Sequence, residues 1–343
     1  MAFTYLLALV LIGLSGLGVA LGGVYLLAGP LFAFGLVPFV ELFMSARHVN
    51  VAPENEDSRL SQIRFDGVVA VSIIAYFALW ALFVYQIVHG AYDGAEVWGA
   101  SAVMGLMCGG IGINLGHELG HRKSKRAQTF AKMLLASSLY MHFFIEHNRG
   151  HHARVATEED PASARRGEIL YAFYFRSIVG GFLSAWQLEF KSQKRRGNWV
   201  WGPQNEMVQF MFIQLGLLVG AYWLGGGVLL LACVMAGFLG ILLLETVNYL
   251  EHYGLRRSRR GRGYEKVLPI HSWNSDHPLG RALLFELSRH SDHHANAKRH
   301  FSILRSMPEA PQLPTGYPGM ILLALVPPVF FAVMHPLLDD MVA

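Results

Sequence analysis

The chain has 343 residues, of which 53% are hydrophobic and only 15% charged, with a formal net charge of +4. This balance is too apolar for an ordinary soluble domain of that length, so we expect an all-α integral membrane protein. Two cysteines, Cys108 and Cys233, are too few for a four-cysteine iron or zinc site and are expected to be packing residues, whereas sixteen histidines are unusually many.

Six apolar runs approach or exceed the roughly 20 residues that a helix needs to cross a membrane. The first has no basic start and is longer than the apolar part of a signal peptide, so we expect a retained span. A further run at 320–335 is broken by Pro327 and Pro328 and is expected to be peripheral or half-inserted. The six expected transmembrane helices are 3–28, 31–46, 67–90, 97–115, 207–225 and 228–250.

The basic residues are sorted along the chain in a way that predicts its topology. All 28 lie within 47–64, 122–196 and 256–305, and the expected turns at 29–30, 91–96 and 225–227 contain none. With six spans, these three segments share one face with the N-terminus, and the positive-inside rule makes that face cytoplasmic. The excess of basic over acidic residues is therefore explained by contact with anionic membrane lipid, and a nucleic-acid partner is not needed to explain it.

This topology predicts five regions along the chain. Residues 1–116 form four transmembrane helices, and 117–206 form a first cytoplasmic segment. Residues 207–250 form two further spans, 251–316 a second cytoplasmic segment, and 317–343 a peripheral C-terminal segment.

Four histidine-rich segments follow the expected spans on the cytoplasmic face. They read HELGH, EHNRGHH, NYLEHYG and RHSDHHA. Histidines four residues apart lie on one face of a helix and can reach the same metal ion. We therefore expect His117 to share a face with His121, and His147 to share one with His151. Adjacent histidines point in different directions and suit two neighbouring metal ions. The nine candidate ligands are His117, His121, His147, His151, His152, His252, His290, His293 and His294.

Nine imidazoles exceed what one ion can hold, so we expect them to be divided between two ions, four or five to each, with positions left for dioxygen. An acidic residue accompanies each segment, and carboxylates often orient a ligating histidine by accepting its second N–H. The alternative is that these acids are simply solvated at the membrane surface. The candidates for this supporting role are Glu118, Glu146, Glu251 and Asp292, with the nearby His142, His271, His277 and His300.

At these segments the chain resembles the membrane alkane 1-monooxygenase (alkane hydroxylase) family, within the histidine-box membrane desaturases and hydroxylases. HELGHR, EHNRGHH and LSRHSDHHA are similar to its three histidine boxes, and NYLEHYGL is similar to its HYG motif. The flanking ATEEDPASARRGE, HSWNSDHPL and PQLPTGYPG also fit. The resemblance covers about 114–319, and the HYG and PQLPTGYP segments are more specific than the boxes, which desaturases and xylene-type monooxygenases share.

The resemblance implies two non-haem iron ions on the nine histidines. It implies terminal hydroxylation of medium-chain n-alkanes to 1-alkanols, with O₂ and two electrons from rubredoxin, itself reduced by an NADH-dependent rubredoxin reductase. It also implies a bacterial inner membrane with the site facing the cytoplasm. The sequence has no GxGxxG fingerprint, so this chain is not expected to oxidise NADH. The basic residues expected to dock an acidic donor are Arg122, Lys123, Arg256, Arg257 and Arg259.

Three alternatives fit part of this pattern. A related membrane di-iron hydroxylase or desaturase would act on fatty acids, terpenes or alkylarenes, and product analysis would separate it from an alkane hydroxylase. HELGH also satisfies the HExxH pattern of an intramembrane zinc metalloprotease, with Glu118 as general base, but seven histidines would be left over. A metal transporter would hold its ligands near the bilayer midplane rather than at one face.

The fourth expected span is rich in glycine. Gly105 and Gly109, and again Gly112 and Gly116, are four residues apart. This spacing predicts either close helix packing or a tunnel that leads an alkane sideways from the bilayer and end-on to the metal.

Overall fold

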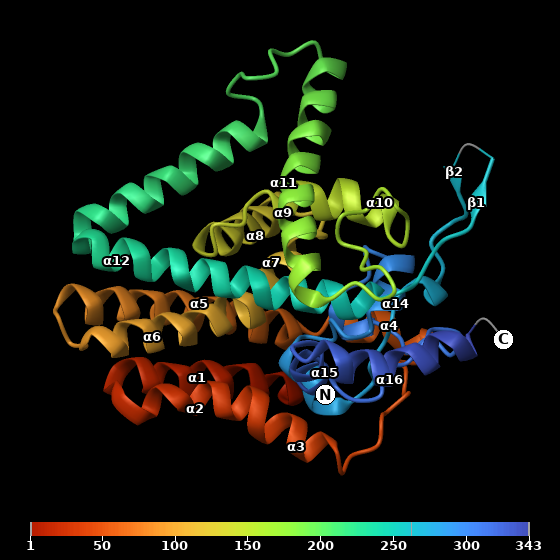
Figure 1. Cartoon of the computed structure of the whole chain (residues 1–343), viewed down its shortest axis with the longest axis horizontal. Coiled ribbons are helices and arrows are strands. Elements are labelled where there is room, and N and C mark those ends of the chain that lie inside the picture. The colour runs from red at the N-terminus through yellow and green to blue at the C-terminus, as the bar shows by residue number, and fades with distance from the viewer. Residues whose placement is uncertain (1, 262, 342–343) are drawn as a thin grey trace.

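The computed structural model describes residues 2–261 and 263–341 and is almost entirely helical (Figure 1). Long apolar helices run alongside one another, and shorter helices gather at one end of this bundle. In the described part of the chain the only strands are β1 (Arg259–Arg260) and β2 (Gly263–Tyr264), which form an antiparallel hairpin.

The first two apolar helices form a hairpin. Helix α1 (Leu6–Leu21) ends at Gly22, and the chain returns through Gly23–Glu41, which contains α2 (Ala28–Leu31) and α3 (Val37–Glu41). The prediction of a turn at 29–30 was wrong, because the turn lies at Gly22 and Gly23, whose φ angles are 68° and 54°. Glycine adopts these positive φ angles without a Cβ clash, whereas Pro30 lies within the returning helix.

The next two apolar helices are longer and lie side by side (Figure 1). Helix α5 (Ile63–Val88) turns into α6 (Gly94–Met107), whose first turn is capped by Asp93 and Glu96 in a reciprocal capping box. After α6 the chain passes through a π-helical segment, Cys108–Ile113, into α7 (Asn114–Gly120). The continuous helix Gly94–Gly120 is the most buried of the apolar helices and leads directly into the first histidine segment.

Helix α12 (Glu206–His252) consists of two arms. Gly225 and Gly226 have non-helical angles, and the φ of Gly226 is 64°, so the helix folds back at the predicted turn. Figure 1 shows the first arm running diagonally away from the bundle and the second arm lying along it. The second arm ends at His252, in the third histidine segment.

Among the described residues, four helices are long and apolar enough to cross a membrane: Gly23–Glu41, Ile63–Val88, Gly94–Gly120 and Glu206–His252. This number is smaller than the six predicted spans because α1 has only 16 residues and the two arms of α12 form one bent helix. The chain is therefore mostly helical with several membrane-spanning candidates, and the six-span topology remains a prediction.

The remaining helices surround the inner ends of the apolar bundle. Helix α11 (Leu170–Arg195) runs across the bundle in Figure 1. The C-terminal apolar run forms two helices, and Phe330 and Met334 of the second are buried. The other elements are α4 (Pro53–Leu60), α8 (Lys125–Ser137), α9 (Phe143–Glu146), α10 (His152–Arg154), α13 (Pro278–Leu283), α14 (His290–Ala295), α15 (Tyr317–Ala324) and α16 (Pro327–Asp340).

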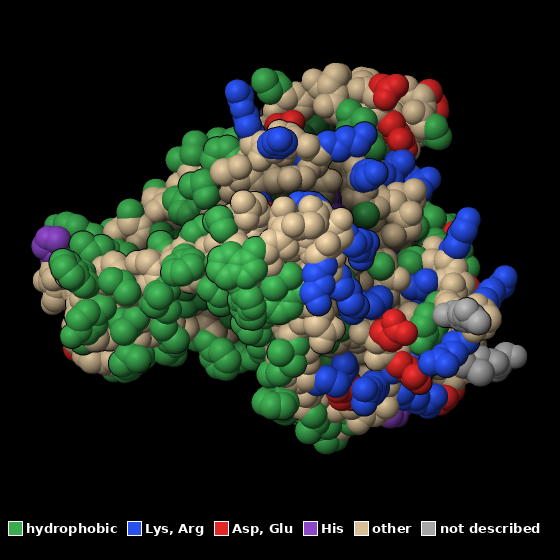
Figure 2. All heavy atoms as spheres, turned by 90° about the horizontal axis from the view of Figure 1, so that it is seen from above, with side chains coloured by type: hydrophobic (Ala, Val, Ile, Leu, Met, Phe, Trp, Pro, Cys, Tyr) green, Lys and Arg blue, Asp and Glu red, His purple; other side chains and the backbone are tan. Residues whose placement is uncertain are grey.

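The surface is divided by polarity. Figure 2 shows hydrophobic side chains covering one end of the molecule, while Lys and Arg gather at the other end. A helical bundle with one apolar end and one basic end is the arrangement expected of a protein whose polar part lies at a membrane surface.

Candidate metal centre

The histidine segments converge from four parts of the chain. The first follows the π-helical segment at the end of the α6–α7 helix, and the second runs from α9 into α10. The third is the end of α12, and the fourth is α14. All nine candidate ligands lie in two groups, in each of which the ligand atoms are within 4.8 Å of one another.

The first, which we call the five-histidine group, contains His117, His121, His147, His152 and His293. Its Nε2 atoms form a nearly continuous set of close contacts. Those of His117 and His293 are 3.0 Å apart, and those of His121 and His147 are 3.1 Å apart. The Nε2 of His152 lies 3.0 Å from that of His147 and 3.1 Å from that of His293.

The second, the four-histidine group, contains His151, His252, His290 and His294, all of them buried. The Nε2 atoms of His151 and His294 are 3.2 Å apart, and those of His252 and His290 are 3.3 Å apart. A carboxylate oxygen of Glu251 also lies 3.1 Å from the Nε2 of His290.

The second histidine segment folds differently from the expectation. We expected His147 and His151 to share a face, but they belong to different groups, and His147 is joined by His152. The reason is that His147–His151 is π-helical, with a wider turn whose backbone bonds connect residues five apart. The adjacent pair His151 and His152 is thereby divided between the groups, as is the pair His293 and His294.

The spacing of the nitrogens fits bound metal ions. A neutral imidazole has one N–H and one acceptor nitrogen, so a ring of facing Nε2 atoms cannot be satisfied by hydrogen bonds alone. Metal–imidazole bonds of about 2.0–2.1 Å place neighbouring ligand nitrogens roughly 2.8–3.0 Å apart in octahedral geometry and roughly 3.3–3.4 Å apart in tetrahedral geometry. The contacts of 3.0–3.3 Å lie within the interval that these two geometries span. The donor set therefore suits a metal that accepts imidazole nitrogen, such as iron, copper or zinc.

The environment keeps most of these histidines neutral. Burial, reinforced by the neighbouring imidazoles, holds the pKa of His147, His293 and His294 well below the usual value. Burial also lowers the pKa of His121 to about 4. Neutral imidazole is the form that binds a metal, so the site is prepared for ligation at neutral pH.

His151 is the exception, because it has a carboxylate partner. Its Nδ1 lies 2.9 Å from Oδ2 of the buried Asp160. Burial acts to lower the pKa of His151, but the charge and hydrogen bond of Asp160 outweigh it, so the pKa is raised. The same contact overcomes the effect of burial on Asp160 and lowers its pKa to about 2. Asp160 thus fixes the ring so that Nε2 faces the four-histidine group.

Sequence reasoning missed Asp160 because it lies nine residues beyond His151, in the EEDPAS stretch, and not beside a histidine. Three of the four predicted acids hold arginines instead. Glu118 pairs with Arg122 at 3.3 Å, and Glu146 pairs with Arg154 at 2.5 Å. Asp292 accepts from Arg305 at 2.8 Å.

Glu251 alone among the four predicted acids contacts a candidate ligand, since it faces Nε2 of His290. Its other oxygen accepts a hydrogen bond from the hydroxyl of Tyr317 at 3.0 Å. Glu251 lies on the Nε2 side of His290, where the other candidate ligand nitrogens lie. It therefore does not contact Nδ1, the nitrogen that an orienting carboxylate was expected to hold.

The four additional histidines lie outside both groups. His142 is buried between the rings of Tyr140 and Phe182. The backbone carbonyl of His271 lies 3.4 Å from Nδ1 of His252, so this residue supports a candidate ligand through its main chain. The Nδ1 of His277 lies 3.1 Å from the hydroxyl of Ser275, and His300 contacts Arg122, Asp66 and Ser302.

The basic residues predicted to dock an electron donor divide into two kinds. Arg122 is committed to Asp66 at 2.7 Å and to Glu118, and Arg257 donates to backbone carbonyls that include that of Ala153. These two arginines therefore stabilise the fold around the site. The exposed members of the set are Lys123, Arg256 and Arg259.

Two apolar cavities with a partly shared lining lie among the helices. A groove of about 640 Å³ lies between α11, α12 and α15, and a narrow cavity of about 40 Å³ lies deeper. Phe34, Leu243 and Ile321 line both. The inner cavity reaches Asn114 and Leu287, each three residues before a candidate ligand, His117 and His290 respectively.

The paired glycines serve helix packing. A Cβ on Gly109 would lie 2.7 Å from the carbonyl oxygen of Gly240, and one on Gly112 would lie 2.5 Å from the hydroxyl of Tyr76. A side chain at either position would therefore strike a neighbouring helix. Gly112 does not line the inner cavity, whereas Gly109 does, so close packing and cavity lining coincide at Gly109. Gly110 also lines the inner cavity, and a Cβ there would meet only Leu106, at 3.9 Å.

Comparisons with known proteins agree with this site. Residues 93–324 match the fatty acid desaturase family. The chain is 38% identical to an alkane 1-monooxygenase of Ectopseudomonas oleovorans, over 90% of this chain and 77% of that protein. It is 38% identical to alkane 1-monooxygenase 1 of Alcanivorax borkumensis, over 90% and 76%. It is 29% identical to the xylene/toluene monooxygenase hydroxylase component of Pseudomonas putida, over 76% and 71%. The resemblance seen in the sequence is confirmed.

Proposed function

We propose that this chain, which belongs to the alkane 1-monooxygenase family within the membrane fatty acid desaturases, hydroxylates medium-chain n-alkanes to 1-alkanols. The observation that carries this proposal is the division of nine histidines into groups of five and four beside an apolar cavity. Each group would hold one iron ion.

Bound iron would supply the activation of dioxygen and the oxidising power for an unreactive C–H bond. The reaction takes one alkane, O₂, two electrons and two protons to one alcohol and water. The chain holds the ligands in place, since Asp160 orients His151 and the carbonyl of His271 faces His252. The buried surroundings exclude bulk water from the substrate.

The substrate would enter sideways from the bilayer. An alkane partitions into lipid, and the outer groove is lined by apolar side chains such as Phe175 and Phe238. The alkane would pass Phe34 and Ile321 into the inner cavity, and this cavity is narrow enough to require that the alkane approaches end-on. End-on approach presents the terminal methyl group first, so position selects this carbon although interior C–H bonds are weaker.

Electrons would come from a rubredoxin that an NADH-dependent rubredoxin reductase reduces. The exposed Lys123, Arg256 and Arg259 suit an acidic donor of this kind. The sorting of basic residues supports an orientation in which the histidine groups face the cytoplasm in a bacterial inner membrane.

Product analysis in competition tests the proposal. The iron-loaded protein, with rubredoxin, its reductase and NADH, would receive octane, decanoate and a cyclic terpene together under ¹⁸O₂. We expect 1-octanol carrying ¹⁸O as the main product, and none from a His290→Ala variant. Preferred oxidation of decanoate or the terpene, or the formation of alkenes, would instead assign one of the related activities.

A further inference from the structure

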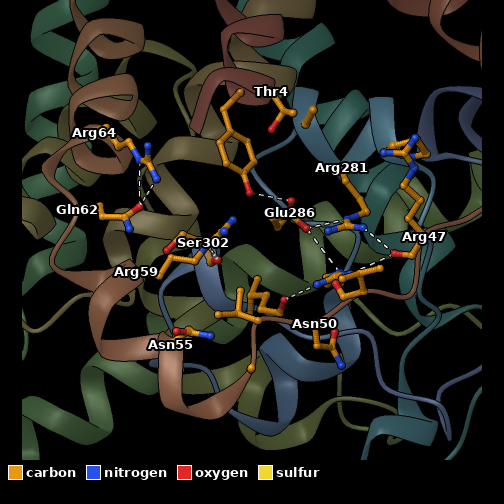
Figure 3. Close-up of a pocket in the computed structure, with 18 of the residues that line it drawn as sticks. Thr4, Arg47, Asn50, Asn55, Arg59, Gln62, Arg64, Arg281, Glu286 and Ser302 are labelled. Atoms are coloured by element: carbon orange, nitrogen blue, oxygen red, sulfur yellow. Dashed lines mark hydrogen bonds and ion pairs between the residues drawn. The ribbon is translucent and has the colours of Figure 1, made fainter. Parts of the chain in front are cut away.

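A second large cavity lies at the basic end of the molecule. It has a volume of about 650 Å³, and none of the nine candidate ligands lines it (Figure 3). Its walls come from the residues just before α1, the segment 47–64 with α4, and the region of α13. This volume is in the range of pockets that bind small molecules.

Arginines dominate the lining. Five line the cavity, against one carboxylate, that of Glu286. The two deeper arginines are already paired within the protein: Nε of Arg281 is 2.7 Å from Glu286, and Nε of Arg289 is 2.9 Å from Asp276. Glu286 is therefore not available to neutralise the others.

The other three arginines have no carboxylate partner among the described residues. Nε of Arg59 donates to the carbonyl of Ser302 at 2.7 Å, and Arg64 donates to the neutral amide oxygen of Gln62. The guanidinium of Arg47 has no hydrogen-bond partner in the described part of the chain. Figure 3 shows Arg59 and Arg64 on one side of the hollow and Arg47 on the other. Three uncompensated positive charges facing one cavity favour an anionic occupant.

The residue type indicates which anion. A guanidinium presents a planar fork of N–H donors that pairs with two oxygens of a phosphate, and arginine is preferred over lysine for such recognition. Asn55 adds an amide to the lining. A phosphate ester can thus be contacted by several donors at once.

The position of the cavity indicates the source of this phosphate. The apolar helices α1 and α5 begin at its rim, at Leu6 and Ile63. Beside the arginines, Val49 is 77% exposed and Ile63 is 85% exposed. Charged and exposed apolar side chains together mark the boundary between lipid headgroups and acyl chains. Anionic phospholipids supply phosphate at this level of the inner leaflet.

We propose that this cavity is a binding site for the phosphate of an anionic phospholipid, held by Arg47, Arg59 and Arg64. The site is separate from the metal centre and does not depend on the identity of the alkane substrate. A lipid bound there would join the segment 47–64 to the start of α1 and stabilise this part of the fold around the metal centre.

The test measures lipid affinity directly. Iron-loaded protein in a neutral detergent would be titrated with short-chain phosphatidylglycerol, short-chain phosphatidylcholine or inorganic phosphate, and binding followed by native mass spectrometry. The test variant is the triple Arg47→Gln, Arg59→Gln, Arg64→Gln. The control is the triple Lys125→Gln, Arg126→Gln, Lys194→Gln, which removes the same charge from exposed residues outside the cavity. Iron content confirms that each variant is folded.

We expect the unmodified protein to bind phosphatidylglycerol more tightly than phosphatidylcholine. The test variant should bind phosphatidylglycerol at least about tenfold more weakly than the unmodified protein, because each basic residue near an anionic lipid raises the affinity roughly fivefold. The control should lose less than twofold. Equal affinity for inorganic phosphate would confirm that the cavity binds an anion but would identify its ligand as free phosphate. Unchanged lipid affinity in the test variant, or equal loss in both, would overturn the proposal. If the triple variant does not fold, Arg47→Gln alone should lose about fivefold, and no loss there would overturn it.

Discussion

At the scale of single residues, the contact between Asp160 and His151 is the best-defined support of the metal centre. Both side chains are buried, and their atoms are 2.9 Å apart. The hydroxyl of Ser163 donates to the same carboxylate oxygen at 2.6 Å, which holds Asp160 in position. The carboxylate therefore fixes which nitrogen of His151 faces the four-histidine group.

Replacing Asp160 with Asn should reduce iron affinity and octane hydroxylation by about 10–100-fold, because the ligand loses its charged orienting partner. Iron retained during dialysis against a chelator measures the first effect, and 1-octanol formation the second. The matched control is Glu159→Gln, which removes an exposed charge one residue away. If the two variants retain iron equally well, Asp160 has no such role.

The neutral state of the histidines predicts a pH dependence. Burial lowers the pKa of His121 from the usual 6.5 to about 4. His121 binds a proton at higher pH in the unfolded chain than in the folded chain. Its contribution to the free energy of unfolding is therefore fully present above about pH 6.5 and is lost as the pH falls toward 4. Protons compete with iron for this nitrogen over the same acidic range.

The iron held by the five-histidine group, which does not contain His151 with its raised pKa, should therefore be the same after gel filtration at pH 7.5 and at pH 6.5, and should fall only at more acidic pH. The ratio of iron to protein across this series is the measurement. Loss of clearly more than half the iron already at pH 6.5 would include the five-histidine group and would show that its ligands titrate as ordinary exposed histidines.

At the scale of elements, the sequence was informative about the long helices and uninformative about local register. Apolar runs identified α5 and both arms of α12, since a spanning helix must be continuously apolar. The turn after α1 was misplaced because Pro30 is a stronger sequence signal than a Gly-Gly pair, although only the glycines take positive φ. The π-helical turns at Cys108–Ile113 and His147–His151 depend on tertiary contacts and have no reliable sequence pattern.

The candidate site shows the same limit. Clustering along the chain was sufficient to find the nine histidines, because each segment is dense. Which histidines face one another depends on the π-helical turn after Glu146, and so the pairing of His147 with His152 was not predicted. Asp160 was missed because its contact is made by a loop that folds back onto the second segment.

The packing of the α6–α7 helix predicts how substrate length is limited. Gly110→Leu should fill the inner cavity without striking a neighbouring helix, and so shorten the longest accepted alkane while iron content stays unchanged. Gly109→Leu should instead clash with Leu243, whose Cβ would be 2.8 Å away, and reduce the amount of folded protein. Alcohol yields from a series of alkanes, compared with iron content, measure both effects. An unchanged length profile for the Gly110 variant would exclude this cavity as the substrate route.

At the scale of the whole molecule, the division into an apolar and a basic end predicts how the electron donor arrives. Steering by Lys123, Arg256 and Arg259 should weaken as salt screens exposed charges. Reversing these three to Glu should therefore raise the KM for rubredoxin at least about tenfold at low salt, with little change in iron content. The same reversal at Lys125, Arg126 and Lys194 serves as the control. A KM indifferent to both ionic strength and these substitutions would place the docking surface elsewhere.

Because the nine histidines form two groups with closely spaced ligand nitrogens, we expect each chain to hold two metal ions. The most direct test is the metal content of the purified, anaerobically iron-loaded chain, determined by elemental analysis against protein concentration. Two groups of ligands predict two irons per chain, and alanine at a member of either group should lower this ratio. A content of one zinc and no iron per chain would contradict the account.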